Sequence, residues 1–466
     1  MKKLKHEPLL LLLVIASTLA IAGMWLFAHR QARQTREHRP IVSFATARPV
    51  LEAHVRELPA QLKEPNEGKW KAWAQHEDNV VRTRLEQGAL DSMINLLLFG
   101  TSFTTQPRVI TMNDFGDPVV QARVTDLVKA LRNPGNNERI IFLRNLLRSR
   151  GVDPDNSAGS DQTKNFVLEN LRRVVQEQNT IREQVDQAGR ESNQETGLSE
   201  RSRVFRDRGI SVDTTILSSF GIDGALRDMA DRGVLPKGSI TRVAVIGPGL
   251  DFTDKGFGYD YYPVQTLQPF AVYDSLVRLG LAERGKIDVI AFDISQEVLE
   301  HLRRARERAK RGEKYVVQLP RESWPWAPEA VQYWRSFGSE IGAPVAAIQP
   351  PPALMGLETR AVAVRPEVVL SCKPVDLNIV LEEFDRSTTG QFDLIIATNV
   401  LIYYDTFEQA LALRNIASLL KPGGFFLTND WLPQVSQIPM RSMGYTPVRY
   451  GESSDWGDNV VWWQRE

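Results

Sequence analysis

Two glycines behind an apolar stretch are the first residues of this 466-residue chain whose spacing points to chemistry. The stretch Arg242–Ile246 is typical of a buried strand, and Gly247 and Gly249 follow it with only Pro248 between them. Because glycine has no side chain, such a loop can turn sharply and approach a bound nucleotide closely. The same spacing also serves turns that bind nothing, so the motif alone leaves a ligand loop and a structural turn both open.

Polar side chains follow two later apolar stretches. Asp293 comes directly after Asp288–Phe292, and its carboxylate is suited to accept both hydroxyl hydrogens of a ribose. Its alternative role is to cap the next helix, with Ser295 close by. Asn399 comes just after Phe392–Ala397, where it is either a site residue or a turn residue. Since parallel strands end at one edge of a sheet, we expect Asp293 and Asn399 to face the same crevice.

Alternating strand-like and helical stretches indicate the sheet that would bring these residues together. The expected strands are Arg242–Ile246, Asp288–Phe292, Ala361–Val369, Phe392–Ala397 and Gly424–Thr428. The expected helices between them are Thr266–Leu281, Gln296–Arg311, Asn378–Phe384 and Thr406–Leu420. A last strand pair, Pro447–Tyr450 and Asn459–Gln464, predicts a C-terminal antiparallel hairpin.

Roughly residues 240 to 466 resemble the class I S-adenosylmethionine-dependent methyltransferases. The matching motifs are Val245–Gly249, Phe292-Asp293, Phe392–Asn399 and Leu419–Gly424. The run Phe392–Asp405 is most similar to the chemotaxis-receptor glutamate methyltransferases. The C-terminal hairpin also distinguishes this fold from nicotinamide-binding relatives.

The resemblance implies S-adenosyl-L-methionine as the cofactor and an unidentified methyl acceptor. The cofactor-binding residues that it implies are Gly247, Pro248, Gly249, Asp251, Asp293, Ile294, Asp376 and Asn399. The candidate catalytic residues are Asn399, Tyr403 and Tyr404, whose expected role is to position the methyl acceptor. Methyl transfer from a sulfonium needs alignment more than a base, so the lack of a nucleophilic histidine or cysteine is no objection.

The chain departs from the family pattern in its first motif. Val245 stands where an acidic residue is usual, and no third glycine follows Gly249. Asp251 or Asp254 is a candidate to replace the missing acid. These departures favour an alternative, a non-catalytic scaffold that keeps the fold without the cofactor. A nicotinamide-dependent oxidoreductase is a second, less favoured alternative.

An insertion, residues 312–360, separates the second expected strand and its helix from the third strand. It is rich in aromatic residues, namely Tyr315, Trp324, Trp326, Tyr333 and Trp334. Such residues either line a site for a flat or apolar acceptor or form a small satellite core. The sequence alone leaves both readings open.

The first half of the chain has a different character. Residues 9–28 form an apolar run of about 20 residues, enough to cross ~30 Å of hydrocarbon as a helix. It predicts a membrane anchor within residues 1–35, with a cleaved signal peptide as the alternative. Residues 36–235 predict a tether and a mainly helical domain that packs on the catalytic half or holds a protein partner. Because the implied cofactor is made in the cytosol, we expect the catalytic domain there.

Composition excludes several classes of site. Lys+Arg and Asp+Glu both number 57, so the absence of net charge offers no case for nucleic acid binding. One cysteine, Cys372, excludes an intramolecular disulfide and a cysteine-rich metal site. The six histidines lack ligand spacing in the second half, so we expect no bound metal. The sequence therefore predicts an α/β, Rossmann-like doubly wound domain at residues 236–466, behind a helical domain and a single transmembrane helix.

Overall fold

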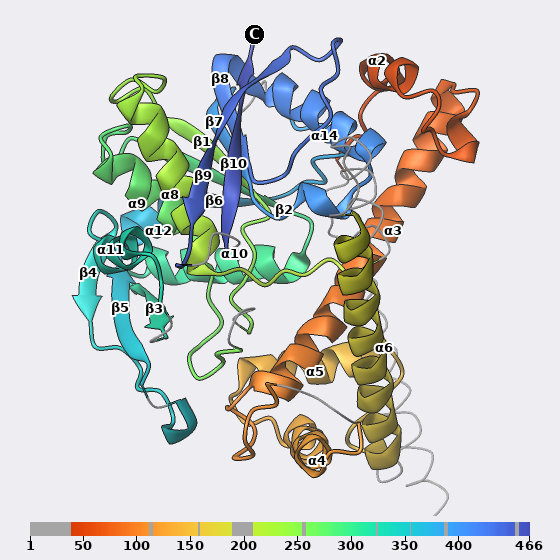
Figure 1. Cartoon of the computed structure of the whole chain (residues 1–466), viewed down its shortest axis with the longest axis vertical. Helices are drawn as coiled ribbons and strands as arrows, with labels where there is room; N and C mark the ends of the chain where they lie inside the picture. Colours follow the sequence, from red (N-terminus) through yellow and green to blue (C-terminus); the bar gives the residue numbers. More distant parts are fainter. Residues whose placement is uncertain are drawn as a thin grey trace, which may run out of the picture. The chain divides into compact units, whose positions relative to one another are not determined.

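The computed structural model describes residues 39–110, 115–156, 159–188, 208–253, 258–322, 325–354, 356–385, 390–452 and 456–466 (Figure 1). Residues Ile41–Glu466 form one compact unit. Among the described residues, none of the helices combines the length and the apolar character needed to span a membrane. The predicted span, residues 9–28, and the candidate acid Asp254 both lie outside these ranges.

Within these ranges the main sheet has seven strands in the order β6-β2-β1-β7-β8-β10-β9. They are β1 (Arg242–Ile246), β2 (Asp288–Asp293), β6 (Cys372–Asp376), β7 (Phe392–Ala397), β8 (Leu420–Thr428), β9 (Met440–Arg449) and β10 (Gly457–Arg465). Pairing is parallel from β6 to β8, whereas β10 runs antiparallel to β8 and β9. The predicted α/β fold, with a mainly parallel sheet and a terminal hairpin, is confirmed.

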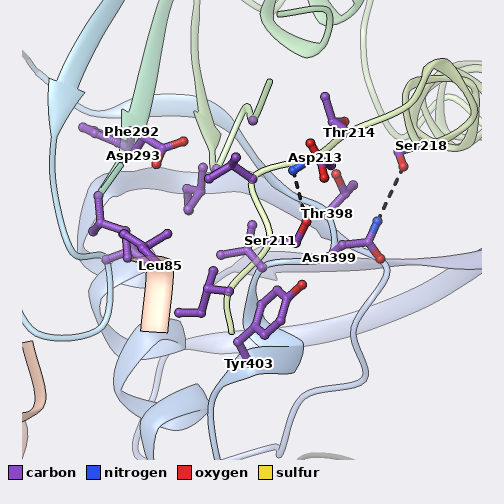
Figure 2. Close-up of a pocket in the computed structure, with 18 of the residues that line it drawn as sticks. Leu85, Ser211, Asp213, Thr214, Ser218, Phe292, Asp293, Thr398, Asn399 and Tyr403 are labelled. Atoms are coloured by element: carbon purple, nitrogen blue, oxygen red, sulfur yellow. Dashed lines mark hydrogen bonds between the residues drawn. The ribbon is translucent and has the colours of Figure 1, made fainter. Parts of the chain in front are cut away.

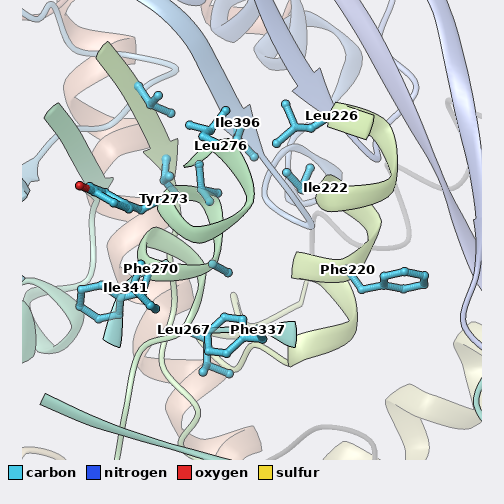
Figure 3. Close-up of a cluster of buried hydrophobic side chains, with 14 of the residues drawn as sticks. Phe220, Ile222, Leu226, Leu267, Phe270, Tyr273, Leu276, Phe337, Ile341 and Ile396 are labelled. Carbon is cyan, nitrogen blue, oxygen red and sulfur yellow. The ribbon is translucent and has the colours of Figure 1, made fainter. Parts of the chain in front are cut away.

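Helices cover both faces of this sheet because its central strands are apolar on both sides. On one face, Val243 and Val245 of β1 share a buried cluster with α8 (Ile216–Asp231) and α9 (Gln268–Arg278). Figure 3 shows Ile222 and Leu226 of α8 and Leu276 of α9 around Ile396 of β7. Other helices of the α/β half include α10 (Gln296–Lys310), α12 (Pro366–Ser371) and α14 (Thr406–Leu419). On the opposite face, Ala244 and Ile246 share a cluster with α14 and α2 (Phe44–Ala53).

A second, three-stranded antiparallel sheet carries the predicted insertion. It contains β3 (Tyr315–Arg321), β5 (Glu358–Val364) and β4 (Gly342–Val345), in that spatial order, with α11 (Pro328–Ser336) between β3 and β4. Tyr315, Tyr333 and Trp334 are buried in the cluster that also holds α9. Of the two readings left open for the aromatic residues, the described ones therefore form core rather than line the site described below.

Two sequence predictions were wrong around this insertion. Ala361–Val369 is no strand of the main sheet, because its first part belongs to β5 and Pro366 then begins α12. In chain order the third parallel strand of the main sheet is β6, and β5 of the second sheet ends at Val364. The predicted helix Asn378–Phe384 is instead one turn at residues 379–381, followed by Glu382, which pairs with Ile41 as an isolated bridge.

The helical half is built around α3 (Glu67–Phe99). The other helices are α4 (Pro118–Arg132), α5 (Glu138–Ser149) and α6 (Gly159–Ala188). Residues near the end of α3, such as Met93 and Leu97, form a core with α4, α5 and α6. Its beginning, with Trp73 and Val81, is buried instead against the sheet and α14. α3 thus joins the helical core to the sheet, and α8, which precedes residue 236, packs with the α/β half.

Candidate functional site

A cavity opens at the carboxyl ends of β1, β2 and β7. It contains about 850 Å³ of space not occupied by atoms, its open mouth included. The lining residues are Leu85, Ile210, Ser211, Val212, Asp213, Thr214, Thr215, Ser218, Ile246, Gly247, Gly249, Phe292, Asp293, Ile294, Leu377, Ile379, Thr398, Asn399, Val400, Tyr403 and Tyr404. Figure 2 shows Asp293 and Asn399 on opposite sides of this cavity.

The loop after β1 requires glycine at both predicted positions. Gly247 and Gly249 have φ angles of 62° and 66°, in the left-handed region that other residues adopt rarely. A Cβ added to Gly247 would lie 2.6 Å from Cγ2 of Val400, and one added to Gly249 would lie 2.5 Å from the carbonyl oxygen of Val212. The glycines therefore let two other segments approach the loop, and both segments line the cavity.

Asp293 lies at the end of β2 with its side chain buried in the cavity wall. Its Oδ1 accepts a hydrogen bond from the Ser295 N–H at 2.7 Å. Burial raises the pKa of Asp293 to about 7, although hydrogen bonds from the main-chain N–H groups of Ser295, Ile294 and Gly249 act to lower it. The cap of α10 is Ser295, whose Oγ accepts from the Val298 N–H. Ser295, and not Asp293, is therefore the residue that caps α10.

Asn399 lies at the mouth of the cavity. Among the described residues other than glycine, it alone has a positive φ, 56°. Asn429 holds it from two sides, because the Asn399 N–H donates to Asn429 Oδ1 at 2.8 Å and Asn429 Nδ2 donates to Asn399 Oδ1 at 2.9 Å. Asn399 Nδ2 also lies 3.5 Å from Ser218 Oγ (Figure 2). A strained conformation held by named partners is typical of a functional position.

Tyr403 and Tyr404 line the wall below Asn399, and both are buried. Burial raises the pKa of the Tyr404 hydroxyl well above its usual range, so this group keeps its proton near neutral pH. Arg84 of α3 donates from Nη2 to the carbonyl oxygen of Tyr403 at 2.9 Å. Tyr404 therefore offers a hydroxyl donor rather than a base.

Three residues predicted at the cofactor site do not line the cavity. Pro248 is buried within the loop. Asp251 faces a buried network, where its Oδ2 accepts from Tyr262 Oη at 2.8 Å and Gln265 Nε2 at 2.9 Å. Asp376 accepts from Arg82 and Gln296 instead of facing the cavity. The structure thus brings together Gly247, Gly249, Asp293, Ile294, Asn399, Tyr403 and Tyr404 from the predicted set.

One wall of the cavity was missed at the sequence level, because it comes from outside the 236–466 range. The segment Ile210–Thr215 runs beside the glycine loop, with the Leu250 N–H donating to Val212 O at 2.8 Å and the Thr214 N–H donating to Leu250 O at 3.0 Å. A cluster of small hydroxyl residues just before α8 was the available signal. Leu85 of α3 carried none, since it looks like any apolar residue of a helix.

Asp213 gives this wall a second buried carboxylate. Its Oδ2 accepts from Ser92 Oγ at 2.8 Å, and its Oδ1 accepts from the Thr253 N–H at 3.4 Å. Asp213 also contributes to the raised pKa of Glu297, about 8, of which burial is the main cause. The described lining thus carries two carboxylates, Asp213 and Asp293, and its other polar side chains are uncharged. In the described ranges, no cluster of His, Cys, Asp and Glu side chains has the arrangement of a metal site.

No protein-family model matches the sequence, and no curated protein matches it either. Among solved structures, the N-methyltransferase NodS from Bradyrhizobium japonicum WM9, in complex with S-adenosyl-L-homocysteine, is 14% identical, covering 52% of this chain and 85% of that chain at a TM-score of 0.25. A TehB-like SAM-dependent methyltransferase from Corynebacterium glutamicum is 12% identical, with coverages of 54% and 90% and a TM-score of 0.25. Magnesium protoporphyrin IX methyltransferase from Synechocystis PCC 6803, with bound SAM, is 12% identical, with coverages of 57% and 90% and a TM-score of 0.24.

Proposed function

We propose that this protein binds S-adenosyl-L-methionine in the cavity and transfers its methyl group to an acceptor that enters beside Asn399. The observation that carries the proposal is the meeting of the Gly247–Gly249 loop with the buried carboxylate of Asp293 in one cavity. The cofactor needs both features. Its ribose hydroxyls require a hydrogen-bond acceptor, and the methionine part attached to the nucleoside must pass close to the main chain of the loop. The strand order supports a Rossmann-like methyltransferase fold.

The residues present fit this cofactor. The Asp293 carboxylate would accept the ribose hydroxyls, and Ile294 and Leu377 offer apolar contact to the base. Asp213 would pair with the cofactor's ammonium group, a role for which the resemblance leads us to expect an acidic residue at position 245, where this chain has valine. Pro248, Asp251 and Asp376 are left out of the proposed set because they do not line the cavity.

Catalysis in this site would depend on alignment. When bound, the cofactor supplies a methyl group on a sulfonium, whose leaving thioether needs no proton. Asn399 and Tyr403 would orient the acceptor, and Tyr404 closes the wall behind them. A fixed geometry of this kind contributes by converting an encounter into an oriented complex. The Asn429 hydrogen bonds that hold Asn399 serve this purpose.

Topology argues against the nicotinamide-dependent alternative. Dinucleotide-binding sheets follow the order 3-2-1-4-5-6. Here the last strand, β10, inserts antiparallel between β8 and β9. The scaffold alternative rests on the departures of the first motif, and the position of Asp213 weakens it. Binding without turnover would be its signature.

Calorimetric titration of the full-length protein with S-adenosylhomocysteine tests the proposal, with NADH as the competing ligand. We expect saturable binding of S-adenosylhomocysteine and none of NADH. The absence of heat with a protein that circular dichroism shows to be folded would contradict cofactor binding. Transfer of a labelled methyl group to a component of a cell extract would then separate an enzyme from a scaffold.

Two finer expectations from the sequence also stand as proposals. From the likeness of Phe392–Asp405 to glutamate methyltransferases, we propose a carboxylate as the methyl acceptor. A methyl label that base releases from the product would support this proposal.

From the apolar run at residues 9–28, we propose a membrane anchor with the catalytic domain in the cytoplasm. Membrane fractionation, with a reporter fused after Glu466, tests both the anchor and its orientation.

A further inference from the structure

We propose that Arg82 of α3 is a positioning residue for the nucleoside end of the cavity, acting on Asp293 through Ile294 and Asp376. The inference rests on the proposed cofactor site and adds to it a residue from the helical half of the chain. Arg82 does not line the cavity, so it acts only through its partners.

The guanidinium of Arg82 bridges the carboxyl ends of two strands. Nη1 donates to the carbonyl oxygen of Ile294 at 2.9 Å, in the turn that follows β2. Nη2 donates to Oδ1 of Asp376, the last residue of β6, at 3.2 Å. Nε donates to Oδ2 of Asp78, one turn earlier on α3, at 3.1 Å. Each of the three guanidinium nitrogens therefore donates a hydrogen bond, and the bond to Ile294 O holds the turn next to Asp293.

The contacts of Arg82 with Asp78 and Asp376 are buried, which strengthens their electrostatic effect. The side chains of Arg82, Asp78 and Asp376 are only 19%, 8% and 11% exposed. An ion pair at this depth is poorly screened, and removing one partner leaves an uncompensated charge. Here Asp78 and Asp376 would both lose the Arg82 cation, and Asp376 is the register partner of Asp293 between β2 and β6.

The charge of Asp376 therefore acts on Asp293, and Arg82 is ion-paired with Asp376. The charge of Asp376 adds to the burial that raises the pKa of Asp293. Asp78 on α3 and Glu382 after β6 also act on Arg82. Asp213 lines the same cavity as Asp293, and Glu297 on α10 interacts with Asp213 and Arg304. Arg82 contacts Asp376 directly as an ion pair. Without it, Asp293 would hold its proton to higher pH.

This link has a consequence for binding. Ribose hydroxyls donate hydrogen bonds, so they favour the ionised form of Asp293. Affinity for the nucleoside should therefore fall as the pH drops through the pKa of Asp293. The pH at which affinity is half lost reports the charges around Asp293, whereas general damage to the fold lowers affinity at every pH.

The test is the pH dependence of S-adenosylhomocysteine binding to the full-length protein, measured by calorimetry between pH 5.5 and 8.5. We expect Arg82→Gln to move the midpoint upward by about half a pH unit or more, and Arg82→Lys to restore much of that shift. Arg173→Gln is the matched control, because Arg173 is a partly buried arginine of the same helical half, paired with Asp91 and Glu177. It should leave the midpoint unchanged.

An unchanged midpoint in folded Arg82→Gln would overturn the inference. If that variant does not fold, Asp376→Asn provides the reciprocal test, since removing the charge should move the midpoint downward, and an unchanged midpoint there is equally contrary. A wild-type protein that binds no S-adenosylhomocysteine at any pH would instead contradict the proposed function.

Discussion

The main-chain N–H of Gly247 donates a hydrogen bond to the carbonyl oxygen of Phe292, the residue before Asp293, at 2.8 Å. This contact joins the loop after β1 to the end of β2, two places that are 45 residues apart in the chain (292 − 247 = 45). A ligand that engages Asp293 therefore meets a glycine loop already fixed in place.

Replacing Asp293 by alanine should weaken S-adenosylhomocysteine binding by about 1–3 kcal/mol, because the ribose would lose a charged hydrogen-bond acceptor. Calorimetry on the full-length protein measures this change. Asp288→Ala is the matched control, since Asp288 lies at the opposite end of the same strand, half exposed and paired with Lys373. Equal affinities of Asp293→Ala and wild type would remove Asp293 from the site.

The free energy of unfolding of the ligand-free protein should contain a component that falls as the pH rises from about 4 to about 7. The folded-state pKa of Asp293 is about 7, above the 3.8 of an ordinary aspartate, so in this window only the folded state holds the proton. Stability is then lost with rising pH, by at most about 4 kcal/mol. Urea titrations of wild type and Asp293→Asn isolate the component, because the variant lacks the titrating group. Parallel pH profiles would show that Asp293 is not perturbed.

The sequence alone predicted the residues that strand ends carry, because a parallel sheet sends every carboxyl end to one edge. Gly249, Asp293 and Asn399 could be placed in this way. The sequence did not predict the lining residues that are distant from the strand ends along the chain. Asp213 and Leu85 reach the cavity through tertiary packing, which no local sequence pattern encodes. Asp376 shows the opposite error: it lies at the end of β6, at the expected edge of the sheet, but its carboxylate accepts from Arg82 and Gln296 and does not line the cavity.

A fragment of residues 236–466 should neither fold well nor bind S-adenosylhomocysteine. It lacks α8, whose buried Phe220 and Leu226 belong to the core shared with α9. It also lacks Ile210–Thr215 and Leu85, which complete the cavity. Size-exclusion chromatography and calorimetry test this expectation. A monomeric fragment with the affinity of the full-length protein would show that the helical half is not part of the site.

Gly88→Ala tests whether contact between α3 and the 210–215 segment shapes the cavity. The Cβ of alanine would lie 1.9 Å from the carbonyl oxygen of Ile210, and because that atom is backbone, the whole segment must shift. We expect a loss of about 1–3 kcal/mol in the free energy of unfolding together with weaker S-adenosylhomocysteine binding. Gly68→Ala is the control on the same helix, because its added Cβ meets nothing closer than 3.4 Å and alanine favours a helix. If Gly88→Ala is destabilised but binds with unchanged affinity, the segment packs against α3 without shaping the site.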